Sequence, residues 1–161
     1  MKTAVAARAY YSDEELAIKG RNFTQMLQSI ELLHRRFLDV ITTELGRRDK
    51  ALSSVQALIL SNVGEKPISL GQLLALGHYE GTNLAYDVNK LAESGYITLS
   101  RPQWDKRSSL IELTGEGREV THLISQALDG HAVSLADIGI TGAELTLVTD
   151  TLRTLNQRWS A

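Results

Sequence analysis

The sequence repeats one helix-start signal four times. In a capping box, a Ser or Thr precedes a Glu or Gln by three residues, and each side chain accepts a hydrogen bond from the other residue's backbone N–H. Each occurrence here comes before apolar residues at helical spacing. The four pairs are Ser12 and Glu15, Ser53 and Gln56, Ser69 and Gln72, and Thr141 and Glu144. We therefore expect helices to begin at all four positions.

A long amphipathic helix is expected over residues 23–45, where apolar side chains recur every three or four positions. We expect Gly20 to interrupt the helix that begins at Ser12, because a glycine within a helix costs about 1 kcal/mol relative to alanine. Glycines also follow the shorter helical patterns, as is common at helix ends. These shorter helices are expected over residues 55–62, 70–76 and 82–94.

The residue spacing changes from helical to alternating after Gly95. Residues 96–100 and 109–113 alternate apolar and polar side chains, which predicts two short β-strands. The segment between them, residues 101–107, contains a proline and several charges, so it suits the turn of a β-hairpin. Two more helices are then expected, beginning at Thr114 and Thr141.

The helix expected over residues 82–94 has two different faces. At about 100° per residue, Leu84, Val88 and Leu91 form one apolar stripe. Asp87 lies near the polar face on the other side of this helix. It argues against DNA binding there, because a carboxylate close to DNA phosphates is unfavourable. Any solvated helix face is polar, so this pattern indicates DNA reading only together with the hairpin. The opposite face carries side chains that can hydrogen-bond base edges or phosphates, namely Thr82, Asn83, Tyr86, Asn89 and Lys90.

The expected hairpin places three cations, Arg101, Lys106 and Arg107, against the single acid Asp105 at an exposed tip. A narrow minor groove attracts arginine at such a position. The hairpin follows directly after the two-faced helix, so both elements can reach one DNA duplex. We predict that the chain binds duplex DNA through the helix near residues 81–94 and the wing near residues 99–112.

Three short helices followed by a two-stranded hairpin form a winged helix-turn-helix. The expected fold is mostly α with a small β-wing, flanked by long dimerisation helices. The compact core of residues 53–113 is too small to cover the apolar stripes of the flanking helices, so we expect a homodimer. The expected domains are an N-terminal segment with a long dimerisation helix (1–50), the DNA-binding domain (51–114) and C-terminal dimerisation helices (115–161).

The wing contains the most specific motif of the sequence. An Asp-x-Arg-Ser motif is followed by an alternating strand and by Leu-Thr-x-x-Gly, which correspond to Asp105, Arg107, Ser108, Leu113, Thr114 and Gly117. With this motif, residues 53–120 resemble the DNA-binding core of the MarR family of transcriptional regulators. The flanking helices match the family's dimerisation region in length and order. Residues 56–66 and 79–86 are similar to the LdtR-like branch of the family.

The resemblance implies that Thr82, Asn83, Tyr86 and Lys90 face DNA and that Arg107 is the wing-tip arginine. It also implies a homodimer on an inverted-repeat operator. The chain departs from the family pattern in two places: residues 80–83 replace the usual Ser-Arg-x-Thr start of the recognition helix, and Asp87 occupies a commonly apolar position. The operator sequence therefore cannot be carried over from relatives.

The resemblance further implies a small amphipathic or aromatic effector, usually an anion, between the dimerisation helices and the DNA-binding lobe. His34 and Arg35, followed by Arg36, lie on the long first helix where such a crevice would form. A cation beside an apolar wall suits an anionic ligand. The alternative is that His34 is an interface residue and that the arginines are solvated.

Several function classes are disfavoured by what the chain lacks. It has no cysteine, which excludes disulfides, thiolate metal sites and sensing through thiol oxidation. The four histidines are spread over different expected helices, and no Gly-rich phosphate loop or nucleophile elbow is present. We therefore expect no catalysis, cofactor or metal. The sequence has no apolar run of the ~20 residues needed to span a bilayer, and its N-terminus does not resemble a signal peptide. We therefore expect a cytoplasmic protein with no membrane partner.

The charge distribution limits where DNA can bind. The net charge is −2, so phosphate contacts must come from a local patch. Residues 119–161 carry two basic and five acidic side chains, which disfavours the C-terminal segment as a DNA surface. The alternative function is a winged-helix module that binds protein without direct DNA readout.

Overall fold

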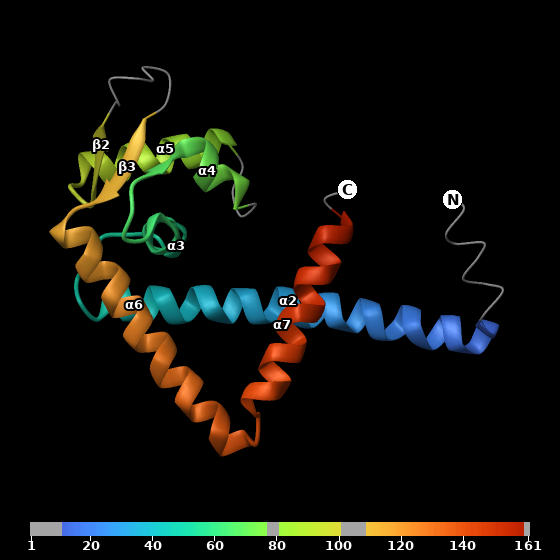
Figure 1. Ribbon diagram of the computed structural model, residues 1–161. Helices are drawn as coiled ribbons and strands as arrows, with labels where there is room; N and C mark the ends of the chain where they lie inside the picture. Colours follow the sequence, from blue (N-terminus) through green and yellow to red (C-terminus); the bar gives the residue numbers. More distant parts are fainter. Residues whose placement is uncertain (1–10, 77–80, 101–108, 160–161) are drawn as a thin grey trace.

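The computed structural model describes residues 11–76, 81–100 and 109–159 (Figure 1). The fold is mainly helical with a small antiparallel sheet, which confirms the expected fold class. In chain order the elements are α2 (Asp13–Gly46), α3 (Ser54–Val63), β1 (Ile68–Ser69), α4 (Leu70–Ala75), α5 (Gly81–Glu93), β2 (Ile97–Ser100), β3 (Leu110–Leu113), α6 (Gly115–Ser134), the 3-10 helix η1 (Leu135–Ile138) and α7 (Gly142–Trp159).

All four capping boxes form as the sequence predicts. The backbone N–H of the Ser or Thr donates to the Glu or Gln side chain over 2.8 Å at Ser12, 3.2 Å at Ser53, 2.9 Å at Ser69 and 2.8 Å at Thr141. The hydrogen bond from the Ser12 backbone lowers the pKa of Glu15, and the bond from the Thr141 backbone lowers the pKa of Glu144. These pairs therefore begin α2, α3, α4 and α7.

The break expected at Gly20 is absent, because α2 continues through it over 34 residues. The local cost of glycine, about 1 kcal/mol, is small against the capping box at Ser12 and the packing of the far end of the helix. Ile41 and Leu45, near that far end, are 2% exposed. The Thr24 hydroxyl donates to the Gly20 carbonyl oxygen over 3.0 Å, so the backbone oxygen of the glycine is also hydrogen-bonded.

The sheet contains one more strand than the expected hairpin. β2 and β3 pair antiparallel, with Ile97 opposite Leu113 and Ser100 opposite Leu110. The two-residue strand β1 pairs with the other edge of β3, so the order is β1-β3-β2. Two residues are too few to give an alternating pattern, so the sequence showed this segment only as the capping box of α4.

One buried core joins the winged lobe to the flanking helices. It contains residues of α3, α4, α5 and the sheet, together with Ile41 and Leu45 of α2 and Val120 and Ile124 of α6. The core therefore extends on both sides beyond the expected DNA-binding domain, residues 51–114. The end of α2 and the first half of α6 pack against each other and against α3, and α5 packs on α3, α4 and β2.

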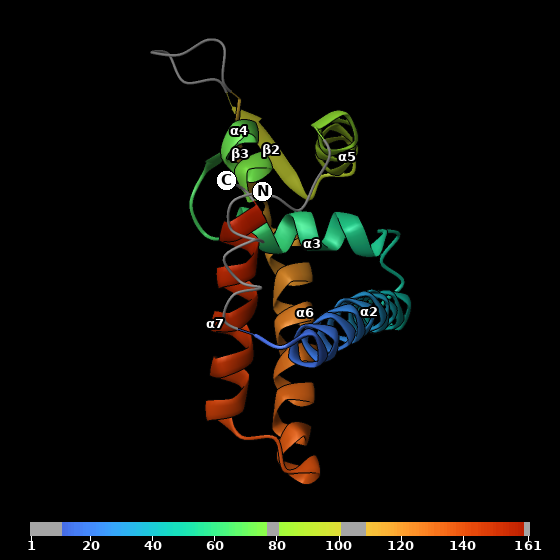
Figure 2. The same cartoon turned by 90° about the vertical axis from the view of Figure 1, so that its right-hand side faces the viewer.

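Helices α6 and α7 form a V whose apex is η1, and α7 returns to cross α2 (Figures 1 and 2). At the crossing, the Phe23 and Trp159 rings meet edge to face with centroids 5.8 Å apart. No residue of α7 is buried. Within the described ranges no single helix is long and apolar enough to cross a membrane, and only α6 with η1 and α7 taken together, bent by 115°, reach that length and composition.

Candidate nucleic-acid interface

Helix α5 lies in the winged lobe at the end of the molecule remote from η1 (Figures 1 and 2). Its predicted apolar stripe is confirmed, since Leu84, Val88 and Leu91 are 1%, 4% and 0% exposed. These side chains pack into the core beside Leu73 of α4 and Leu60 of α3. The opposite face of α5 is therefore directed away from the protein.

The predicted DNA-facing residues of α5 that can be described lie on this outer face. Asn83 and Asn89 are exposed, and Tyr86 is 62% exposed although it is a large aromatic residue. Thr82 lies in the first turn of the helix. An exposed face that combines amide, phenol and ammonium groups can reach both base edges and phosphates.

Lys90 is held on the same face by an ion pair within the helix. Its Nζ lies 2.8 Å from Glu93 Oε2 and 6.0 Å from the centroid of the Tyr86 ring. The hydrogen bond to Glu93 raises the pKa of Lys90, so the lysine stays charged at neutral pH. Exposed ion pairs contribute little net stability, so a DNA phosphate can replace Glu93 at low cost.

Asp87 does not point at the expected DNA surface. It is half-buried, and its Oδ1 accepts a 3.0 Å hydrogen bond from Nε2 of Gln56 in α3. The sequence indicated Gln56 only as a capping residue and Asp87 only as an unfavourable charge. A partner 31 residues away leaves no local signal, so neither role could be found from spacing.

The wing is described only at its base. β2 and β3 pair at this base (Figure 1), and Ile97, Ile111 and Leu113 on them belong to the buried core. Arg101, Asp105, Lys106 and Arg107 lie outside the described residues. Their contribution to DNA binding stays a prediction.

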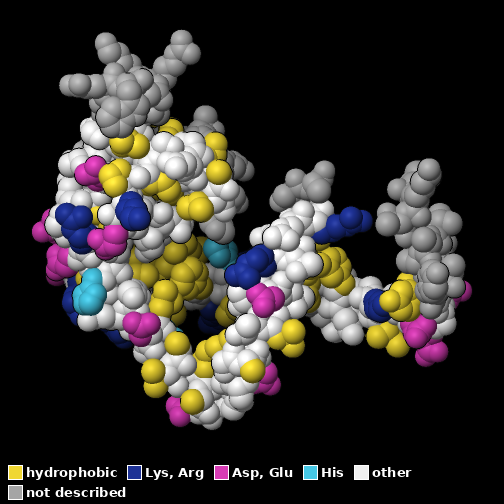
Figure 3. Space-filling view, in the orientation of Figure 1, with side chains coloured by type: hydrophobic (Ala, Val, Ile, Leu, Met, Phe, Trp, Pro, Cys, Tyr) yellow, Lys and Arg dark blue, Asp and Glu magenta, His cyan; other side chains and the backbone are white. Residues whose placement is uncertain are grey.

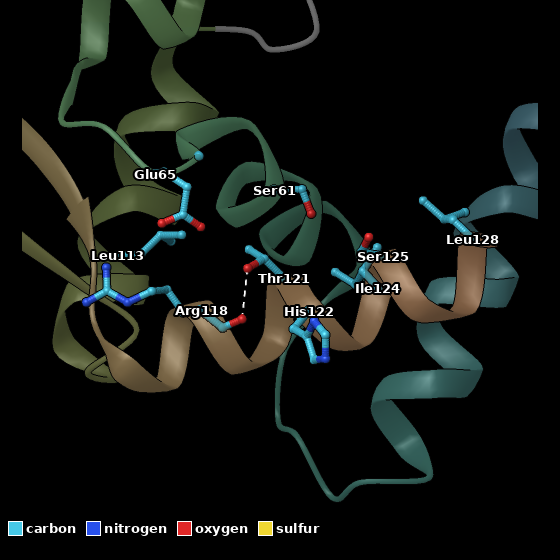
Figure 4. A pocket seen from close by; sticks show the side chains of 10 residues that line it. Ser61, Glu65, Leu113, Arg118, Thr121, His122, Ile124, Ser125 and Leu128 are labelled. Atoms are coloured by element: carbon cyan, nitrogen blue, oxygen red, sulfur yellow. Dashed lines mark hydrogen bonds between the residues drawn. The ribbon is translucent and has the colours of Figure 1, made fainter. Parts of the chain in front are cut away.

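A cavity of about 570 Å³ lies between α3 and α6, below the base of the wing. Figure 4 shows Glu65 and Arg118 beside Leu113 at one end and Leu128 at the other. The hydroxyl groups of Ser61, Thr121 and Ser125 lie between, and that of Thr121 donates to the Arg118 carbonyl oxygen over 2.9 Å. The cavity thus combines charged groups and hydroxyls with the apolar side chains of Leu113, Ile124 and Leu128.

The predicted effector residues lie elsewhere. His34 and Arg35 are exposed on α2, and Arg35 pairs with Glu31 one turn before it. Neither residue lines the cavity between α3 and α6. Arg118, which lines the cavity one residue after Gly117, was not singled out in the sequence analysis, and an effector role for His34 and Arg35 stays a prediction. In the described part of the chain, no cluster of three His, Asp or Glu side chains could hold a metal ion.

Comparison with known proteins relates this interface to regulators of transcription. The model of a winged helix DNA-binding domain matches residues 52–117. The exopolysaccharide II synthesis transcriptional activator ExpG of Rhizobium meliloti (strain 1021) is 31% identical over 138 residues, covering 85% of this chain and 71% of the relative. The match thus extends across the winged lobe into the flanking helices.

Solved structures share the fold at low sequence identity. A putative MarR family transcriptional regulator from Listeria monocytogenes, complexed with 26mer DNA, has a TM-score of 0.72 at 21% identity and covers 82% of this chain and 87% of its own. MarR from Staphylococcus aureus, in complex with salicylate and kanamycin, has a TM-score of 0.71 at 17% identity and covers 89% of this chain and 95% of its own. Both likenesses extend beyond the winged lobe, since such coverage requires at least part of the flanking helices.

Proposed function

Because the chain belongs to the MarR family of winged-helix transcriptional regulators, we propose that it binds an inverted-repeat operator as a homodimer. In this proposal α5 enters the major groove, and the wing near residues 99–112 reaches the neighbouring minor groove. The observation that carries the proposal is the outer face of α5, where Asn83, Tyr86 and Lys90 are exposed opposite a buried apolar stripe. Duplex DNA as the partner agrees with the expected cytoplasmic location.

The homodimer is supported by the apolar surface that one protomer leaves uncovered. α7 has no buried residue, and Leu147 and Val148 on it are 68% and 55% exposed. An apolar groove of about 390 Å³ runs between α2 and α7, lined by Met26, Ile30, Leu33, Leu147, Val148 and Leu152 among others. Figure 3 shows apolar side chains gathered around the hollow between the winged lobe and α7. A second copy that buries these surfaces would remove them from water.

A small anionic aromatic effector is part of the proposal, and we assign it to the cavity between α3 and α6. Arg118 can pair with a carboxylate there, and the hydroxyls beside it can orient a polar ring substituent. The cavity lies between the end of the winged lobe and the first half of α6, so an occupant would touch both. Isothermal calorimetry with salicylate as probe tests this assignment, since Arg118→Met should remove binding whereas Arg35→Met should not.

The DNA-binding proposal is tested by fluorescence anisotropy of the full chain on a random 30-base-pair duplex at several salt concentrations. Binding through phosphates releases counterions, so log K should fall linearly with log salt, with a slope of about 0.9 per neutralised phosphate. A slope corresponding to several phosphates supports the proposal. No binding at low salt, or binding that salt does not weaken, would instead indicate the protein-interaction module.

A further inference from the structure

The side chain of Gln56 makes two hydrogen bonds in two different directions. Its Oε1 accepts from the Ser53 backbone N–H over 3.2 Å and closes the capping box of α3. Its Nε2 donates to Asp87 Oδ1 over 3.0 Å and so connects α3 to the middle of α5. This second bond is partly buried, which shields it from competing water.

The hydrogen bond from Gln56 meets α5 at Asp87, next to the residues of the proposed DNA-reading face. Asp87 follows Tyr86 directly and lies one helical turn after Asn83. The buried stripe of Leu84, Val88 and Leu91 sets which side of α5 faces the core, although hydrophobic attraction by itself is non-directional. The hydrogen bond from Gln56, which caps α3, is directional, so it adds a constraint on the rotation of α5 about its axis.

We propose that Gln56 and Asp87 are positioning residues for DNA-sequence discrimination, acting through the rotation of α5. The inference rests on the proposed function, since it assumes that α5 reads base edges. Base contacts require donor–acceptor distances within a few tenths of an ångström, whereas a flexible lysine follows a phosphate through larger shifts. Loss of the Gln56 to Asp87 bond therefore weakens binding to the specific sequence more than binding to any duplex.

The chain allows this bond to be changed without touching the helix cap. Gln56→Glu keeps an oxygen that accepts from Ser53 N–H, but it places a second carboxylate against Asp87. Asp87→Asn keeps an oxygen that accepts from Gln56. In the double variant, the amide introduced at position 87 donates to the carboxylate introduced at position 56, so the bond is restored in the reverse direction.

A matched control is available in the neighbouring capping box. Gln72 Oε1 accepts from Ser69 N–H over 2.9 Å at the start of α4, and Gln72 is exposed. Gln72→Glu adds the same charge to the same lobe and keeps the cap. It therefore measures the general effect of one added negative charge on DNA binding.

The experiment measures dissociation constants of the wild-type chain and the four variants for two probes. These probes are the 30-base-pair duplex most enriched by the wild-type chain from a random library and the same duplex with its bases shuffled. We expect Gln56→Glu to reduce the ratio of the two affinities about tenfold or more, since each base contact contributes about that much. Asp87→Asn, the double variant and Gln72→Glu should keep the wild-type ratio. Thermal midpoints verify that all five proteins are folded.

Three outcomes overturn the inference, and they can be distinguished. If Gln56→Glu is folded and keeps the wild-type ratio, or if the double variant fails to recover it, the pair does not position α5 for reading. If the wild-type chain itself does not distinguish the two duplexes, the proposed function fails and the inference fails with it.

Discussion

The Thr114 hydroxyl donates a 2.7 Å hydrogen bond to the carbonyl oxygen of Gly95, which joins the start of α6 to the end of α5. The same hydroxyl accepts from the Gly117 N–H over 3.2 Å as the cap of α6, and the Thr114 N–H donates to the Tyr96 carbonyl over 3.0 Å. This geometry explains the Leu-Thr-x-x-Gly motif. Thr114 binds the two chain segments together, and Gly117 leaves room for Tyr96.

The first prediction concerns Gly117. A Cβ built there would lie 2.1 Å from the Tyr96 carbonyl oxygen, so backbone must move to accommodate Gly117→Ala. Overpacking of this kind typically costs about 1–3 kcal/mol, and we expect at least that loss in urea unfolding. Gly115→Ala is the control, because nothing lies within 4 Å of a Cβ at that position. Equal stability of the two variants would show that the close approach does not exist.

The second prediction separates base contacts from phosphate contacts on α5. Asn83→Ala should reduce specific binding by about 1–3 kcal/mol and leave random duplex nearly unaffected. Lys90→Ala should weaken all duplexes alike, since an ammonium group on a phosphate carries no sequence information. Competition assays with specific and random DNA measure both effects. If Asn83→Ala lost equal affinity for specific and random DNA, Asn83 would not be a base-reading residue.

The third prediction concerns the wing, whose tip lies outside the described residues. If Arg107 enters a minor groove, Arg107→Ala should lower affinity and reduce the salt slope by about one phosphate equivalent. Footprinting should also show less protection on the flanks of the site. If Arg107→Ala leaves both the salt slope and the protection of the flanks unchanged, this contact is excluded.

The fourth prediction concerns α7 and the dimer. Because α7 contributes no residue to the buried core, a chain that ends before Thr141 should keep its folded winged lobe. It should lose the dimer in sedimentation velocity and lose operator binding with it, because one half-site binds too weakly. Val148 on α7 is 55% exposed, and Val148→Glu, which places a charge on this apolar surface, should act in the same direction. A truncated chain that is dimeric and binds the operator would place the interface elsewhere.

The fifth prediction concerns an ion pair between the end of α2 and the start of α6. Lys50 Nζ lies 3.0 Å from Glu116 Oε2 and 3.1 Å from Glu119 Oε2. The hydrogen bond to Glu116, followed by that to Glu119, raises the pKa of Lys50 above its ordinary value. Because the Lys50 pKa is higher in the folded state, the ion pair contributes its full stabilisation when the pH is below the unfolded-state pKa of about 10.4. This stabilisation is lost as the pH rises through the folded-state pKa.

The measurement is the difference in unfolding free energy between the wild-type chain and Lys50→Met. It should be constant between about pH 7 and 9 and should decrease at more alkaline pH. In Lys50→Arg, the ion pair with the two glutamates should stabilise the fold over the whole pH range, because arginine stays charged. A difference that does not change up to about pH 11 would show that the Lys50 charge is not what stabilises this junction.

The elements were predictable where their signals are local. A capping box such as Ser53 with Gln56 lies within four residues, so sequence alone locates the helix start. The stripe of Leu84, Val88 and Leu91 likewise predicts both the helix and its buried side. The outer face of α5, which is the main candidate site, follows from that stripe.

The features that could not be predicted depend on contacts between distant segments. Gly20 is helical because the capping box at Ser12 and the packing at the far end of α2 together outweigh its local cost, and the partner of Asp87 is 31 residues away. The cavity at Arg118 exists only once α3 and α6 are packed together. His34 and Arg35 are exposed on α2, and their role in effector binding stays a prediction.

The central claim is that a dimer reads an inverted repeat through α5. It is tested most directly by selecting duplexes from a random library with the full chain and sequencing those that bind. The account predicts an enriched inverted repeat whose half-sites are about one helical turn apart, ~34 to 36 Å, and weaker enrichment of that repeat when Asn83→Ala is used. No enrichment, or enrichment of a single unrepeated site by both proteins, would contradict it.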